Sequence, residues 1–127
     1  MILVGDKYKL CDLGSALTSP VDFGKLSKKE KKSFEKYITH NSTLIYNAPE
    51  MIEPAGKTVG TPVDIWMLGC VAYILTFGVH PFKEKKSSLR NWTVHYPQEG
   101  FMTDLIQGMM QIDPSQRLSA PDVLRRL

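Results

Sequence analysis

The feature that most constrains the fold is an apolar segment near the middle of the chain. Thr61-Pro62 precedes it, a pair typical of a helix start, with Thr at the cap and proline in the first turn. Gly78 and Pro81 end it. Its apolar residues cover most of the helical circumference: Val63, Ile65, Trp66, Leu68, Val71, Ala72, Ile74 and Leu75. A helix that is apolar nearly all round is expected to be buried at the centre of a domain.

Composition indicates one globular domain. The chain has 127 residues, of which 43% are hydrophobic, so a core is expected rather than disorder. The formal net charge of +3 is too small to predict nucleic acid or a membrane surface as a partner. The apolar run Ile65–Phe77 is too short to span a bilayer, and the residues after Met1 do not resemble a signal peptide. Cys11 and Cys70 lie in apolar surroundings, which is typical of reduced thiols in a cytoplasmic protein.

The remaining elements are predicted to be short. Residues 2–4 and 7–11 form a hairpin around a Gly5-Asp6 turn. Helical segments are expected at 48–53 and 103–110, and a polar, exposed segment at 83–90. A capping pattern at 119–122 predicts a final helix that turns Val123, Leu124 and Leu127 inward. The predicted fold class is mainly α, with one small hairpin at the N-terminal edge.

Residues 15–43 show no sustained period, which predicts a long loop with a short polar helix at 27–37. The loop is rich in lysine: Lys25, Lys28, Lys29, Lys31, Lys32 and Lys36. Glu30 and Glu35 alternate with them, so the simplest interpretation is a solvated face. Four of its residues are candidate phosphorylation sites, because an added phosphate can pair with a nearby lysine: Ser27, Ser33, Thr39 and Ser42.

Two triplets carry the functional signal. Asp12-Leu13-Gly14 follows the hairpin, and Ala48-Pro49-Glu50 comes some thirty residues later. In this order they resemble the two ends of a protein-kinase activation segment. The whole chain, 1–127, resembles the C-terminal lobe of a eukaryotic protein kinase, without the N-lobe. Three runs are most similar to the numb-associated group of Ser/Thr kinases: residues 10–16, 43–46 and 64–70.

The resemblance implies a role for each matching residue. Asp12 stands where the family holds the Mg²⁺ that bridges the phosphates of ATP, a task suited to a carboxylate oxygen. Leu3 matches the position that packs under the adenine ring and Cys11 the position beside it; both also fit an ordinary strand core. Thr43 matches the residue that contacts the catalytic Asp and the protein substrate. Leu13 replaces the usual Phe as an apolar plug.

Three further residues are implied to be structural. Glu50 and Arg117 match a buried ion pair, for which the planar guanidinium is well suited. Asp64 matches a buried carboxylate that accepts hydrogen bonds from the catalytic loop. Asn47 departs from the Arg common in the subgroup, which leaves the peptide preference open.

The 127 residues contain no Gly-rich loop, no strand Lys with its helix Glu and no His-Arg-Asp loop, and Met1 stands at the family's second metal-binding Asn. We therefore expect a piece of a Ser/Thr kinase that is inactive alone. The alternatives are a pseudokinase-like interaction module and an unrelated helical domain. Expected partners are a protein substrate, the missing N-lobe and a second copy through an exposed apolar surface around Leu3 and Leu10; nucleic acid and membrane insertion are not expected.

Overall fold

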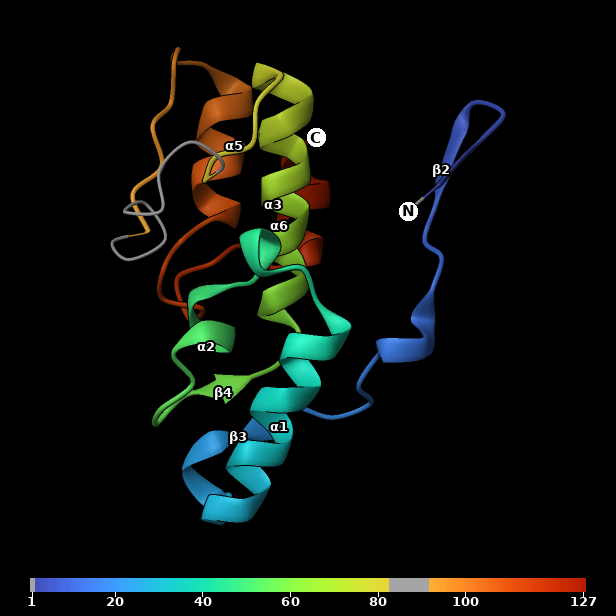
Figure 1. Ribbon diagram of the computed structural model, residues 1–127. Coiled ribbons are helices and arrows are strands. Elements are labelled where there is room, and N and C mark those ends of the chain that lie inside the picture. The colour runs from blue at the N-terminus through green and yellow to red at the C-terminus, as the bar shows by residue number, and fades with distance from the viewer. Residues whose placement is uncertain (1, 83–91) are drawn as a thin grey trace.

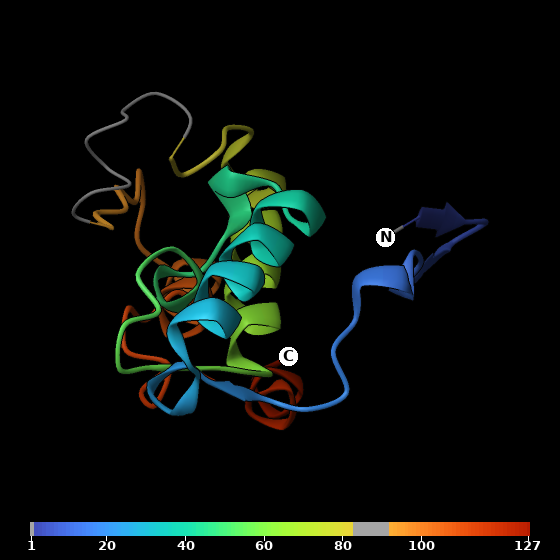
Figure 2. The same ribbon diagram turned by 60° about the horizontal axis from the view of Figure 1, so that its bottom comes forward.

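The computed structural model describes residues 2–82 and 92–127, with side chains from Val4 onward. Most of these residues form a helical body, and an N-terminal arm runs beside it (Figures 1 and 2). The arm carries β1 (Ile2–Val4) and β2 (Lys7–Lys9), an antiparallel pair in which Leu3 lies opposite Tyr8. Gly5 turns the chain between them with φ of 63°, which glycine adopts without steric cost. The mainly helical fold with a small hairpin is thus confirmed.

The centre of the body is α3 (Pro62–Phe77), which packs along α5 (Phe101–Met109). Trp66 and Cys70 on α3 and Ile106 on α5 are completely buried. Burial raises the pKa of the Cys70 thiol to about 12, so it is protonated and unreactive at neutral pH.

The prediction that α3 is buried all round is wrong on one side. Leu68 is exposed and Leu75 keeps 70% of its surface in solvent, because no described element covers that face. Thr61 stands at the N-cap of α3, as expected. Thr61 already has helical dihedral angles, so its side chain makes no capping hydrogen bond, although Pro62 does occupy the first turn.

The lysine-rich segment forms a regular helix, α1 (Lys28–Asn41), which extends past the predicted boundary. Ser27 and Glu30 form a reciprocal capping box at its start. Ile38 is buried, and the Phe34 ring lies 6.5 Å from that of Phe23 in η2 (Phe23–Lys25). These contacts hold one side of α1 on the body.

Short elements complete the fold. The sequence did not predict the small antiparallel sheet of β3 (Val21–Asp22) and β4 (Thr58–Val59). The remaining elements are η1 (Leu13–Ser15), η3 (Leu44–Tyr46), α2 (Pro49–Ile52) and α6 (Ala120–Arg126). The polar segment predicted at 83–90 lies outside the described residues.

The final helix, α6, is only partly as predicted. Ser119 and Asp122 form the expected capping box, and Val123 is buried. Leu124 is 74% exposed, and Leu127 is exposed as well. Successive residues lie about 100° apart around a helix, so a helix that meets the body along one narrow side cannot bury Val123 and Leu124 together.

Candidate functional site

Asp12 lies where the arm turns from β2 into η1. Its backbone is left-handed, with φ and ψ both 62°, a conformation that Asp tolerates better than most residues. The side chain is exposed. The sequence prediction of a carboxylate that leaves a strand and faces open space therefore agrees with the geometry.

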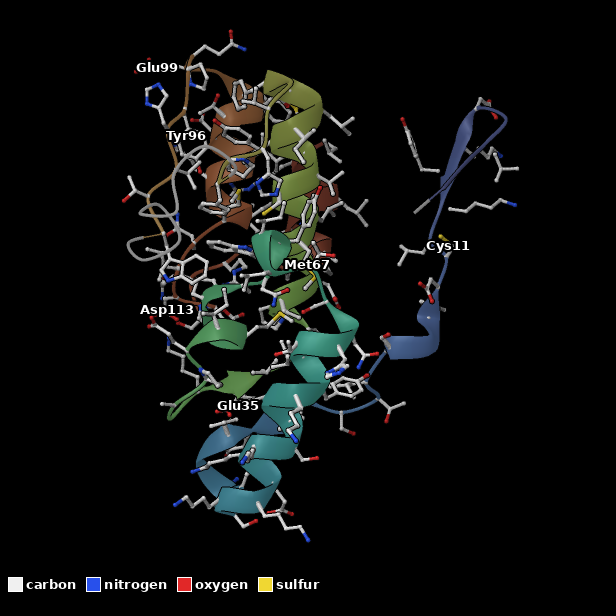
Figure 3. All side chains as sticks on the ribbon, in the orientation of Figure 1. Cys11, Glu35, Met67, Tyr96, Glu99 and Asp113 are labelled. Atoms are coloured by element: carbon white, nitrogen blue, oxygen red, sulfur yellow. The ribbon has the colours of Figure 1, made fainter. Side chains whose placement is uncertain are left out.

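A cavity of about 390 Å³ lies between the arm and the helical body. Cys11 and Asp12 line it from the arm, Tyr37 from α1, and Asp64 and Met67 from α3. Figure 3 shows Cys11 on the arm and Met67 on α3, and both residues line this cavity. Asp12 and Asp64, which are far apart in the sequence, thus line the same cavity.

Two hydrogen bonds tie the end of η1 to α1, and sequence reasoning missed both. The Tyr37 hydroxyl donates to the Ser15 carbonyl oxygen at 2.8 Å, and the Ser15 hydroxyl donates to Asn41 Oδ1 at 3.1 Å. Tyr37 and Asn41 are four residues apart and share one face of α1. This spacing of four residues is the sequence signal from which a polar contact face on α1 could have been predicted.

Asp64 is not buried, which corrects the sequence prediction. Its side chain is exposed at the cavity, and it forms no hydrogen bond with any residue of 2–82 or 92–127. In the resembling family the backbone of the catalytic loop covers this carboxylate, and that loop is absent from the 127 residues. Partial desolvation by the cavity wall raises the pKa of Asp64 above its usual value.

The pKa values of Asp64 and Asp122 are expected to shift in opposite directions from the usual value of Asp. Asp64 should titrate above 3.8, while hydrogen bonds from the Ser119 side chain and backbone, with a smaller contribution from Arg125, should hold the pKa of Asp122 below it. A lowered pKa contributes stability that is present above the unfolded value and lost as the pH falls through the folded value, so acid should loosen the α6 cap. Carboxyl-detected NMR titration measures both. An Asp64 midpoint at or below that of Asp122 would show that the cavity wall does not desolvate Asp64.

The ion pair expected between Glu50 and Arg117 is present and buried. Arg117 Nη1 and Nη2 donate to the two Glu50 carboxylate oxygens at 2.7 and 3.0 Å, and the side chains keep 0% and 1% of their surface exposed for Arg117 and Glu50. The guanidinium also donates to the carbonyl oxygens of Pro62 and Gln111 and lies 5.2 Å from the Trp66 ring centroid. The pair therefore joins α2 to the start of α3 and to the segment before α6.

Thr43 is exposed and caps η3 without a side-chain hydrogen bond. It does not line the cavity, although the preceding residue, Ser42, does. In η3 the Tyr46 ring meets His80 edge-on, with centroids 4.7 Å apart, and the adjacent Asn47 is buried. The segment 43–46 is thus a surface turn, anchored behind by Tyr46 and Asn47, that presents Thr43 and Leu44 to solvent.

The resemblance placed Leu3 and Cys11 at the adenine ring and made Leu13 an apolar plug. Cys11 is half-buried at the cavity. The backbone of Leu3 is paired in β1, and its side chain is outside the described part. Leu13 was expected to be a packed plug, but it is 67% exposed because no described residue covers it. The role of each residue toward a nucleotide stays a prediction.

The donor chemistry at Asp12 suits a hard cation such as Mg²⁺, since an exposed carboxylate is a favoured ligand. Within 2–82 and 92–127, however, no three His, Cys, Asp or Glu side chains come together as a metal cluster. Asp12 can therefore supply one ligand of a site whose other ligands must come from the nucleotide, water or further protein.

None of the described helices is both long and apolar enough to cross a membrane.

Comparison with known proteins identifies the family. The sequence matches the protein kinase domain over residues 2–126. The chain belongs to the protein kinase domain family.

Several kinases are similar along most of the chain. It is 32% identical over 127 residues to a probable serine/threonine-protein kinase of Dictyostelium discoideum, covering 96% of this chain and 15% of that protein. It is 33% identical over 117 residues to the serine/threonine-protein kinase sel-5 of Caenorhabditis elegans, covering 88% of this chain and 11% of that protein. The chain thus spans less than a sixth of the length of these relatives.

Proposed function

We propose that this chain is part of an ATP-dependent serine/threonine protein kinase of the numb-associated group, which transfers the γ-phosphoryl group of ATP to protein hydroxyls. The family membership and the serine/threonine kinases among its relatives support the activity. The observation that carries the proposal is the buried pair of Glu50 with Arg117, which fixes the end of the activation segment on the helical body. The subgroup rests on the runs 10–16, 43–46 and 64–70.

In this proposal each site residue has one task. Asp12 holds Mg²⁺ against the phosphates of ATP, and the ion neutralises their charge. Leu3 and Cys11 lie beside the adenine ring. Thr43, on the surface turn, contacts the catalytic Asp and the protein substrate. The unpaired cysteines agree with a cytoplasmic location, which is part of the same proposal.

The 127 residues alone are proposed not to transfer phosphate. Positioning of the reactants is worth roughly 7–11 kcal/mol, and a catalytic base adds a factor of about 10²–10⁴. The chain has none of the groups that supply the base or the Lys that clamps the phosphates. Radiolabelled ATP with a mixture of protein substrates tests this for the purified chain and for any longer product of its gene. Phosphate transfer by the longer product but not by the 127 residues would support the proposal. If neither sample transfers phosphate, the protein is a non-catalytic, kinase-like module.

The arm is expected to promote self-association or to bind a kinase N-lobe. Leu10 is 82% exposed, and Tyr8, Leu13 and Leu17 are also exposed along the same arm. Light scattering after gel filtration should show a dimer or larger species whose fraction rises with concentration. Leu10→Glu should shift the population toward monomer, whereas Leu124→Glu on exposed α6 should not. A monomer at all concentrations, or equal effects of both changes, would contradict an interface on the arm.

A further inference from the structure

One side of α1 carries a row of exposed lysines, here called the lysine stripe and made of Lys28, Lys29, Lys32 and Lys36. Lys28, Lys32 and Lys36 recur at every fourth residue, so they stand above one another along the helix, with Lys29 beside them. The apolar residues of α1 are on its other side, where Phe34 and Tyr37 are half-buried and Ile38 is buried. The stripe therefore contains no apolar side chain, and exposed Glu35, seven residues after Lys28, stands at its edge.

The stripe has no acidic partner in the described part of the chain. Lys25, which is outside it, pairs with Asp22, and Lys31 is half-buried over the Phe23 ring. Glu30 is held by the Ser27 cap, and Glu35 (labelled on α1 in Figure 3) forms no ion pair with any described lysine. The interpretation from composition, a solvated face of mixed charges, holds at one edge of the stripe, because Glu35 comes three residues after Lys32 and shares its side of the helix. Four lysines outnumber this one acid, so the stripe keeps a net positive charge.

The stripe is rigid and leads to the surface turn. The capping box fixes one end of α1, and Tyr37 and Asn41 fix the other through Ser15. Asn41 is the last residue of α1, and Thr43 follows two residues later. A chain lying along the stripe can therefore continue past Thr43 and exposed Leu44 without leaving the surface.

The spacing of the stripe selects the form of its ligand. Every fourth residue of a helix advances by about 6 Å. Alternate side chains of an extended peptide repeat at about 6.6–6.8 Å. Acidic residues at every second position of an extended segment can therefore meet Lys28, Lys32 and Lys36 in turn. Exposed ion pairs contribute little singly, so it is the matched row that gives useful affinity.

We propose that the lysine stripe binds an extended acidic segment of the protein substrate and so holds the substrate's acceptor Ser or Thr near Thr43. This inference rests on the proposed function and adds a substrate class to it. A membrane surface fits less well, because interfacial helices place apolar side chains beside the basic ones. Nucleic acid fits less well too, because the stripe carries neither arginine nor an aromatic side chain for stacking.

Fluorescence anisotropy on the full 127-residue chain tests the proposal without phosphate transfer. The probe is a labelled peptide of about eight residues, long enough in extended form to cover the stripe, with Glu at alternate positions. Its controls carry Gln at those positions, or the same Glu residues in one block at the end. Replacement by Gln should remove most of the binding, the blocked arrangement should weaken it, and added salt should weaken it as well.

The variant K28Q/K32Q/K36Q should weaken binding of the alternating peptide by about tenfold or more. The matched control K7Q/K9Q/R126Q removes the same charge from exposed sites elsewhere and should change binding less than about twofold. Circular dichroism should show both variants folded, since Gln and Lys have similar helix propensities. Equal losses in the two variants would mean that net charge alone attracts the peptide, and would overturn the proposal.

A second test compares the peptide with other anions. Vesicles containing phosphatidylserine, or a single-stranded oligonucleotide, should bind more weakly than the peptide and with less dependence on the stripe; the opposite order would overturn the choice of ligand. In a kinase-competent longer product, the stripe variant should raise KM for an acidic substrate with kcat unchanged. Peptide binding without any phosphate transfer would count against the proposed function and leave the stripe intact. Phosphate transfer without stripe-dependent peptide binding would overturn the proposed role of the stripe and leave the proposed kinase function standing.

Discussion

Arg117→Met is expected to lower the free energy of unfolding by about 3–5 kcal/mol, because it leaves the Glu50 carboxylate buried without its partner. It also removes the donors to the carbonyl oxygens of Pro62 and Gln111. Typical domains are stable by about 5–15 kcal/mol, so a loss of this size decides whether much of the chain is folded. Urea unfolding followed by circular dichroism measures it.

The matched control is Arg125→Met, since Arg125 also pairs with an aspartate but on the surface of α6. Such an exposed pair contributes about 0.2–1 kcal/mol. Replacing both members of the buried pair, as in E50L/R117M, should recover part of the loss because no unpaired charge remains. If Arg117→Met costs no more than Arg125→Met, the buried pair does not hold the body together.

Features encoded by neighbouring residues were predicted well. Gly5-Asp6 gives the hairpin turn, and Ser119 with Asp122 gives the α6 capping box, because each depends on residues within one turn of the chain. The pairing of Glu50 with Arg117 is different in kind, since 67 positions separate the two residues. Family resemblance predicted it; local pattern does not contain it.

Exposure was predicted less well, because it depends on what covers a residue. Leu75 and Asp64 lie in a helix whose sequence has no distinct polar side, and the pattern gives no sign that one side of it is open to solvent. The end of α1 was missed because Tyr37 and Asn41 are held by Ser15, which is remote in sequence. The β3–β4 pair has two residues in each strand, too few to show alternation.

Asp12 offers the largest expected effect on activity. In a longer product of the gene that transfers phosphate, Asp12→Asn should lower kcat on the order of 10²–10⁴-fold. The reason is that metal stabilisation of transition-state charge is worth several kcal/mol, and about 1.4 kcal/mol corresponds to each factor of ten. The amide remains a weak oxygen ligand, so raising the Mg²⁺ concentration should restore part of the rate. A steady-state phosphorylation assay over a range of Mg²⁺ measures both effects.

Asp6→Asn provides the matched control on the same arm. Asp6 is exposed in the hairpin turn and is not among the residues that line the cavity, and Asn suits such a turn equally well. This variant should keep the wild-type rate and Mg²⁺ dependence. If Asp12→Asn behaves like Asp6→Asn, Asp12 is not a metal ligand. A third outcome is that Asp12→Asn is inactive at every Mg²⁺ concentration and has also lost its folded spectrum. The left-handed backbone at Asp12 would then matter for structure. In that case Asp12→Glu, which keeps the carboxylate, would separate the effect of charge from that of conformation.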